Sequence, residues 1–170
     1  ADKYYHIDSL LTNGASVQEA TNQTAYTSVW VNVTATGMLA AAFAENVTTN
    51  TGTPIWWLMQ YGLSTNEAGA LYDEGDNTPA WKEYIAGTDP TNGLSVLRVT
   101  NILFGAGSVQ VGWSGGQPVW QFLERATNLL GTPTIWTVIW SNEPPNATAT
   151  NFTDSAMTNK DQFYRLRSHR

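Results

Sequence analysis

The sequence predicts a mainly β protein with N-terminal β-strands, a short helix-turn-helix linker and a C-terminal β-sandwich. Three observations support this fold class. First, β-branched and aromatic residues are concentrated in short stretches near both ends of the chain, and such residues favour strands. Second, Asn, Gly and Pro separate these stretches at short intervals, as in all-β domains. Third, the middle of the chain repeats a Pro-x-Trp pattern followed by Gly, which favours two short helices.

Residues 1–50 are expected to form the first β module. Tyr4-Tyr5-His6-Ile7 predicts a strand, and Asn13-Gly14 is a dipeptide suited to a tight hairpin turn. Residues 26–33 are rich in β-branched and aromatic residues and predict a second strand, and residues 38–43 predict a third. The alanines in this last stretch also have high helix propensity, so a helix is the alternative there.

Residues 51–93 are expected to form the helical linker. Thr53-Pro54-Ile55-Trp56 and Thr78-Pro79-Ala80-Trp81 share the pattern T-P-x-W, and a glycine, Gly62 or Gly87, follows six residues after each Trp. Thr is a good N-cap residue, Pro suits the first helical position, and Gly accepts the left-handed conformation that ends a helix. The pattern therefore predicts two short helices, with an acidic turn between them.

Residues 94–170 are expected to form a third module made of strands. Six short strands with regular turn signals are typical of a small β-sandwich of immunoglobulin or fibronectin type III character. The predicted strands are residues 95–104, 108–113, 119–125, 135–141, 151–153 and 162–167.

The composition excludes several classes of function. The 170 residues carry 14 acidic and 8 basic side chains, a net charge of -6, with no cluster of Lys or Arg, so nucleic-acid binding is not expected. No apolar run reaches about 18 residues, so no membrane span is expected. The absence of cysteine excludes disulfides, thiol catalysis and Cys-ligated metals. A chain poor in charge and rich in Asn, Thr and aromatic residues favours an extracellular location, and its start at Ala1-Asp2-Lys3 fits a processed secreted chain or a shortened one.

Charge is distributed unequally along the chain. Residues 1–92 contain ten acidic and two basic residues, a net charge of -8, whereas residues 93–170 contain four acidic and six basic residues, a net charge of +2. Opposite charges at the two ends favour weak head-to-tail contacts between copies of the chain.

The acidic turn at residues 72–77 is the strongest candidate for a metal site. Hard cations such as Ca²⁺ bind carboxylate and carbonyl oxygens. In the register of a twelve-residue calcium loop, Glu74, Asp76 and Glu83 take positions 3, 5 and 12, while Tyr72 takes the position of an acidic ligand. The nearby acids Asp73 and Asp89 could supply the missing oxygens. The alternative is a solvated acidic turn beside the second helix, whose N-terminus favours negative charge.

The sequence gives little indication of catalysis. Its two histidines, His6 and His169, lie near opposite ends, and no G-x-S-x-G nucleophile motif is present. Carboxylates of the acidic turn could form the pair of a glycoside hydrolase, but acids on one turn more often bind a metal or face solvent. We therefore expect a protein that is not an enzyme.

Aromatic residues and glycosylation motifs offer two further interpretations. Eight Trp and seven Tyr could fill small cores, which the burial tendency of Trp favours, or could form a platform for sugars. Five N-x-[ST] motifs are more than chance predicts, and they suggest N-linked glycans unless Thr residues carry O-linked sugar instead. The candidate glycosylation sites are Asn22, Asn32, Asn46, Asn146 and Asn151.

The middle of the chain resembles a known calcium-binding repeat. Residues 54–63 and Ala80-Trp81-Lys82-Glu83-Tyr84-Ile85-Ala86-Gly87-Thr88-Asp89-Pro90 are similar to the thrombospondin type 3-like repeat of large secreted bacterial proteins. There an acidic D-x-D-x-D-G segment precedes W-x-E-Y-x-A-G-T-D-P, and here residues 73–77 are an eroded form of that segment. The resemblance implies Ca²⁺ ligands at Asp76, Glu83 and Asp89, with Glu74 a conservative match and Asp73 close by.

The flanking modules resemble parts of bacterial surface proteins. Residues 4–45 are similar to the later half of a divergent internalin-type B-repeat, and residues 124–130, 136–137 and 163–167 are similar to the β-sandwich that closes such proteins. Half of a β-repeat should leave an unpaired edge at Tyr4, Tyr5, His6 and Ile7, and an open edge is a template for strand pairing with another chain.

These resemblances imply a non-catalytic structural subunit. We expect it to join copies of itself head-to-tail by strand pairing, in an extracellular fibre or a cell-surface assembly. The alternative is a glycan-binding or adhesive module of a larger secreted protein.

Overall fold

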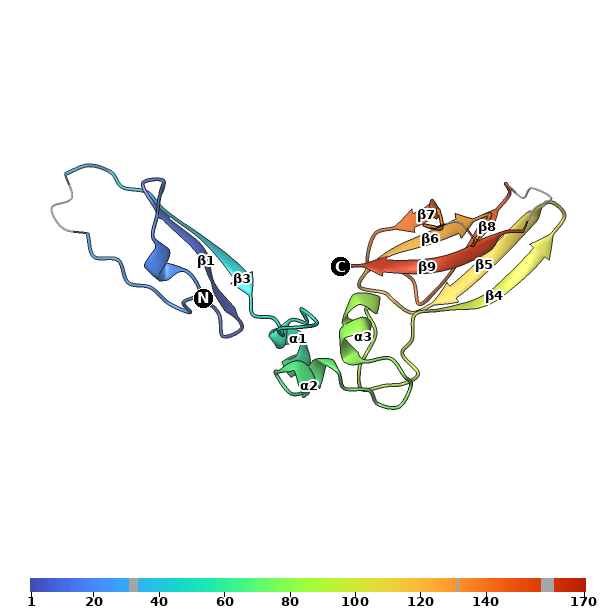
Figure 1. The fold of residues 1–170 in the computed structure, drawn as a ribbon, viewed down its shortest axis with the longest axis horizontal. Helices are drawn as coiled ribbons and strands as arrows, with labels where there is room; N and C mark the ends of the chain where they lie inside the picture. Colours follow the sequence, from blue (N-terminus) through green and yellow to red (C-terminus); the bar gives the residue numbers. More distant parts are fainter. Residues whose placement is uncertain (31–33, 131, 157–160) are drawn as a thin grey trace. The chain divides into compact units, whose positions relative to one another are not determined.

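The computed structural model describes residues 1–30, 34–130, 132–156 and 161–170 and divides the chain into two compact units (Figure 1). Unit 1 spans Ala1–Ala70, and unit 2 spans Leu71–Arg170. The predicted mainly β class is confirmed, because strands form three small antiparallel sheets. The predicted linker, residues 51–93, is divided between the two units. Among the described residues, no helix is long and apolar enough to cross a membrane.

The sheet of unit 1 has the strand order β2-β1-β3. Strand β1 spans Tyr5–Thr12 and β2 spans Ala15–Ser16. Asn13 and Gly14 join them with φ values of 51° and 82°, which confirms the predicted hairpin turn. A short 3-10 helix, η1, spans Gln18–Ala20 and covers the buried face of β1.

The prediction of an unpaired edge at Tyr4 to Ile7 is wrong. Strand β3, Leu39–Glu45, pairs with β1 along its length, and Tyr5, His6 and Ile7 face Glu45, Ala44 and Phe43. On the opposite side of β1, the Ile7 amide donates to the Gln23 carbonyl at 2.8 Å, and the Ile7 carbonyl accepts from Asn22 at 2.8 Å. The terminal strands of this sheet are therefore β2 and β3, because β1 lies in the middle.

Two further predictions for unit 1 have different outcomes. The alanine-rich stretch forms strand β3, so the strand prediction is confirmed over its helical alternative. Residues 26–30 are not part of a strand, and the remainder of that predicted strand, residues 31–33, lies outside the described residues. Despite their strong β propensity, residues 26–30 pair with no neighbouring strand in the part of the chain that the structure describes.

Both predicted helices form, but their N-caps differ from the prediction. Helix α1 spans Ile55–Gln60 and α3 spans Ala80–Ala86. Their N-caps are Pro54 and Pro79, and neither helix has a side-chain cap hydrogen bond, so the threonines do not cap them. Gly87 ends α3 with a φ of 67°, as the pattern predicted.

A third helix, α2, spans Glu67–Ala70 and was not predicted. At four residues it carries too little periodic pattern to be distinguished from a turn in the sequence.

Unit 2 contains two three-stranded sheets, with strand orders β4-β5-β8 and β7-β6-β9. All six predicted strands are present with shifted ends. The strands are β4 Arg98–Gly105, β5 Ser108–Ser114, β6 Trp120–Ala126, β7 Thr137–Asn142, β8 Ala149–Asp154 and β9 Phe163–His169.

One hydrophobic core joins the two sheets of unit 2. Val111 and Trp113 of β5 and Leu123 of β6 are almost fully buried, and Trp140 and Leu166 pack against them. The Trp113 indole donates to Oε1 of Gln121 at 2.7 Å, and Gln121 in turn donates to the carbonyls of Gly115 and Gly116. Trp113 thus buries its ring while its polar N–H stays satisfied, which is the core role expected for Trp.

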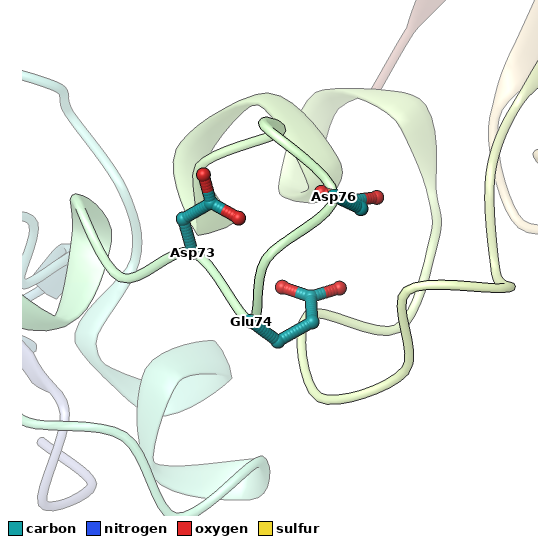
Figure 2. Close-up of side chains that lie close together, drawn as sticks. All are labelled: Asp73, Glu74 and Asp76. Carbon is teal, nitrogen blue, oxygen red and sulfur yellow. The ribbon is translucent and has the colours of Figure 1, made fainter.

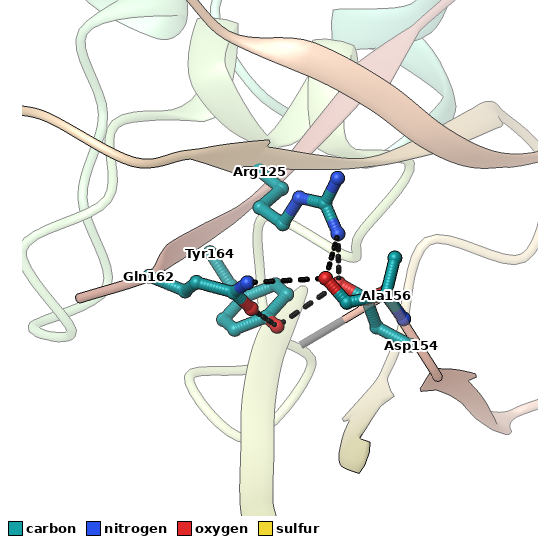
Figure 3. Close-up of polar contacts among 5 residues, drawn as sticks. All are labelled: Arg125, Asp154, Ala156, Gln162 and Tyr164. Atoms are coloured by element: carbon teal, nitrogen blue, oxygen red, sulfur yellow. Dashed lines mark hydrogen bonds and ion pairs between the residues drawn. The ribbon is translucent and has the colours of Figure 1, made fainter. Parts of the chain in front are cut away.

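A polar cluster at one end of unit 2 also connects the sheets (Figure 3). Arg125 of β6 forms an ion pair at 2.7 Å with Asp154 of β8, and the Tyr164 hydroxyl donates to the same carboxylate at 3.1 Å. Burial alone would raise the pKa of Asp154, but the Ala156 amide, Arg125 and Tyr164 together lower it. This carboxylate is consequently used for structure.

The shared core predicts a large cost for truncating its central leucine. Leu123→Ala should lower the free energy of unfolding of unit 2 by about 2–5 kcal/mol, because it removes fully buried methyl groups and leaves a cavity. Leu130→Ala, at a position 94% exposed, should change it by less than about 0.5 kcal/mol. Urea unfolding followed by Trp fluorescence measures both, and equal effects of the two substitutions would contradict the shared core.

Candidate metal centre

The loop that precedes α3 is closed by its own hydrogen bonds. The Tyr72 carbonyl accepts from the Ala80 amide at 2.8 Å, so the chain returns to its starting point before the helix begins. Within the loop, Oδ1 of Asp73 accepts from the amides of Gly75 and Asn77 at 2.7 and 3.1 Å. Gly75 and Asn77 both have positive φ, a conformation that Gly and Asn tolerate best. Asp73 therefore holds the loop in shape.

This loop brings three carboxylates together (Figure 2). Oxygens of Asp73, Glu74 and Asp76 lie within 4.8 Å of one another, and Glu74 and Asp76 are half-buried while Asp73 is exposed. Oδ1 of Asp76 accepts from the Thr78 amide at 2.7 Å. Its Oδ2 and both oxygens of Glu74 are buried with no hydrogen-bond partner among the described residues. Three buried carboxylate oxygens are thus left without a donor.

Helix α3 contributes a fourth such oxygen through Glu83, whose side chain is fully buried. Oε1 of Glu83 accepts from the Thr88 hydroxyl at 3.1 Å, while Oε2 has no hydrogen-bond partner among the described residues. Burial, followed by the negative charge of Glu74, raises the pKa of Glu83 to about 7. The charges of Asp76 and Asp89 raise this pKa further, and the hydrogen bond from the Thr88 hydroxyl lowers it. Glu74, Asp76 and Asp89 therefore all act on Glu83.

Asp89 lies on the turn that follows α3. Its Oδ1 accepts from the backbone amide and the hydroxyl of Thr91, at 3.0 and 2.7 Å, and the Asp89 amide donates to Ser95. These bonds hold the turn, and the Asp89 charge still acts on Glu83. All five acids predicted from the sequence therefore belong to one region of unit 2, in which Asp73 and Asp89 shape the turns and Glu74, Asp76 and Glu83 hold the unpartnered oxygens.

Two residues of this region were not predicted from the sequence. Thr88 donates to Glu83, and Gly93 passes so close to the acidic loop that an added Cβ would lie 3.4 Å from Cβ of Asp76 and 3.7 Å from Cγ of Glu74. A turn threonine and a turn glycine carry no signal of their own in a single sequence, because both are common in any loop. Only the folded chain shows that they border the acids.

The donor set fits a hard divalent cation. Buried carboxylate oxygens without donors are costly because desolvation penalises their charge, and a cation would remove that cost. The set contains only oxygens and comes from two segments, the loop and α3, as Ca²⁺ ligands often do. Asp73, Glu74 and Asp76 are the residues whose oxygens lie close enough together to hold an ion, and the unpartnered Oε2 of Glu83 is the candidate ligand from α3.

The other candidate sites have different environments. His6 shares a 2.8 Å hydrogen bond between its Nδ1 and Oδ1 of Asn46, so this sequon asparagine is engaged within unit 1. Asn146 is buried, and its Nδ2 donates to three backbone carbonyls, the closest that of Val119 at 2.6 Å. A glycan on Asn146 would have to break these bonds in the folded chain. Asn22 and Asn151 are exposed.

Asn32, the remaining candidate for glycosylation, lies outside the described residues. Glycosylation at the four described asparagines stays a prediction.

Comparison with protein-family models, with curated proteins and with solved structures finds no match to this chain.

The raised pKa of Glu83 predicts a specific pH dependence in the absence of metal. The protonated form is favoured in the folded state, so Glu83 contributes its full stability below pH 4.5 and loses that contribution as the pH rises through about 7. In EGTA, Glu83→Gln should gain stability relative to the unsubstituted chain between about pH 5 and pH 8.

Thermal unfolding at several pH values measures this difference, with exposed Glu143→Gln as the control for charge removal. If the difference in stability between Glu83→Gln and the unsubstituted chain stays constant across this pH window, the burial of an uncompensated carboxyl group at Glu83 is contradicted.

Proposed function

We propose that this chain is a non-catalytic, calcium-stabilised structural subunit that assembles with copies of itself outside the cell. The observation that carries the proposal is the group of buried carboxylate oxygens on Glu74, Asp76 and Glu83 that lack a hydrogen-bond donor. Such oxygens are a cost to the metal-free fold and a binding site once Ca²⁺ is present.

Bound Ca²⁺ would act by joining segments of unit 2. Glu74 and Asp76 lie on the loop before α3, and Glu83 lies on α3 itself. Their coordination to one ion would lock the loop onto the helix, because neither segment could then move without losing ligands. Small modules with modest cores commonly rely on a metal in this way.

The use of the buried charges in unit 2 supports a structural role over catalysis. Glu124 accepts from Arg165 at 2.5 Å and from Arg167 at 3.0 Å, and Asp154 pairs with Arg125. Burial tends to raise the pKa of Glu124, but hydrogen bonds from the two arginines lower it. These carboxylates are held ionised by fixed partners, as expected for groups that stabilise a fold.

We interpret unit 2 as an incomplete immunoglobulin-like sandwich. Its sheet order β4-β5-β8 corresponds to strands A, B and E of that fold, and β7-β6-β9 corresponds to strands C′, C and F. The immunoglobulin fold has a further strand, G, beside strand F. Among the described residues, no strand lies next to β9 in that position, which favours completion by another chain.

An extracellular setting agrees with the chemistry of the acidic region. A site with few ligands fits the weak calcium affinities of extracellular modules, where the ion is abundant. The exposed sequons at Asn22 and Asn151 agree with the same setting.

A glycan-binding or adhesive module is the alternative function. Two of the aromatic rings of unit 2, those of Trp136 and Phe122, are poorly placed to stack on a sugar. The Arg165 guanidinium lies 4.3 Å from the ring centre of Trp136, and that of Arg167 lies 4.3 Å from the ring centre of Phe122. One face of each ring is therefore covered by a cation, which reduces the surface left for a sugar.

Calcium should raise the thermal stability of unit 2. At a free Ca²⁺ concentration about 100 times Kd, the expected gain is about 2.7 kcal/mol, or roughly 10 °C in Tm for a domain of this size. Glu83→Gln should lose most of this gain because it removes a ligand charge, whereas exposed Glu143→Gln should retain it. Differential scanning calorimetry with Ca²⁺ or EGTA provides the measurement, and an unchanged Tm in the unsubstituted chain would refute the calcium site.

Self-assembly should depend on protein concentration. Purified chain in Ca²⁺ is expected to elute earlier from a sizing column as its concentration rises, and to form filaments visible by negative-stain electron microscopy. A chain that stays monomeric at all concentrations and is retained on a polysaccharide column would favour the adhesive alternative.

A further inference from the structure

Unit 2 has an apolar groove between the edges of its two sheets. A cavity of about 470 Å³ lies there, lined by Ile102 and Phe104 of β4, Val109 of β5, Phe163 and Tyr164 of β9, and the polar residues Asp161 and Gln162 that precede β9. Both bordering strands, β4 and β9, are terminal in their sheets. Phe104 is 80% exposed, although Phe is usually buried. The groove therefore combines unpaired backbone edges with apolar side chains that solvent can reach.

Unit 1 offers a strand with the complementary properties. Strand β3 is terminal in its sheet, and Leu39-Ala40-Ala41-Ala42-Phe43-Ala44 is an uninterrupted apolar run. Such a run is typical of a strand covered on both faces. In this chain, however, Leu39 is 56% exposed and Phe43 is 55% exposed. Natural proteins usually protect an exposed edge with charges, and this run carries none.

Charge also favours contact between these two elements of different copies. Strands β4 and β9 together carry Arg98, Arg165 and Arg167 and no acidic residue, and two of these arginines, Arg165 and Arg167, also pair with Glu124 of the same unit. Unit 1 carries five acidic residues and one basic residue, a net charge of -4, and β3 ends at Glu45. The acidic unit would thus be attracted to the basic strand edges of a neighbouring copy.

We infer that β3 of one copy occupies the groove of the next copy and pairs with the open edge of β9. This inference rests on the proposed self-assembly and names its two surfaces. In this position β3 takes the place of strand G, and Leu39 and Phe43 fill the cavity lined by Ile102 and Phe104. The pairing is heterologous, because the surface that donates differs from the surface that accepts, so repetition of the contact builds a fibre.

Cross-linking between single-cysteine variants tests the contact, and the lack of native cysteine makes each introduced thiol unique. A tagged Ala42→Cys chain, with its thiol on β3, is mixed with an untagged Asp161→Cys chain, with its thiol at the groove. A bismaleimide of about 10 Å span then joins neighbouring thiols. Exposed Ala147→Cys, outside the groove lining, replaces Asp161→Cys in the control mixture.

The mixture with Asp161→Cys should give several times more mixed dimer than the control mixture. Adding Phe43→Lys to the Ala42→Cys chain should reduce the yield at least about tenfold, because a lysine would be buried in an apolar groove. Adding Val29→Lys instead, at a position 79% exposed outside β3, should leave the yield unchanged.

Electron microscopy of the same samples separates the two levels of the proposal. Filaments without selective cross-linking to Asp161→Cys would overturn the β3 contact while leaving the proposed function intact. The absence of any assembly at any concentration would overturn both. Selective cross-linking that Phe43→Lys fails to reduce would also overturn the assignment, since Phe43 would then lie outside the contact.

Discussion

Unit 2 buries carboxylates from two segments, the loop before α3 and α3 itself, and some of their oxygens have no hydrogen-bond donor among the described residues. Glu74, Asp76 and Glu83 are the residues concerned, and the pKa of Glu83 rises to about 7 as a result. A metal-free chain would have to bind a proton or tolerate the repulsion, whereas one divalent cation satisfies the group at once. These acids lie on the loop before α3 and on the helix, and Asp89 on the turn after it also acts on Glu83.

The β sheets share a second feature, which is the presence of apolar side chains beside open strand edges. The sheet of unit 1 has the apolar strand β3 at an open edge, and unit 2 has a groove between β4 and β9. Each feature is a liability in an isolated chain because unpaired edges promote association. Together they agree with the proposed strand exchange, in which a unit 2 stabilised by Ca²⁺ would accept the incoming strand.

Sequence patterns predicted local structure well where one residue type decides the outcome. Asn13-Gly14 gave the hairpin and Gly87 the helix end, because both depend on positive φ. Sequence patterns failed where the structure of a segment depends on a pairing strand from elsewhere in the chain. The position of β1 in the middle of its sheet depends on pairing with β3. Residues 26–30 form no strand because, among the described residues, no neighbouring strand pairs with them. Spacing predicted Glu74, Asp76 and Glu83, with Asp73 and Asp89 as nearby acids, but the division of roles required the burial of Glu83 and the turn bonds of Asp73 and Asp89.

Calcium binding linked to proton release tests the central claim most directly. Isothermal titration of Ca²⁺ at pH 7, in buffers of different ionisation enthalpy, gives both the stoichiometry and the protons released. One ion per chain should bind, and about half a proton should leave, since a carboxyl group of pKa about 7 is half protonated at that pH. Glu83→Gln should remove the proton release. No binding heat with the unsubstituted chain, or binding without a released proton, would contradict the account.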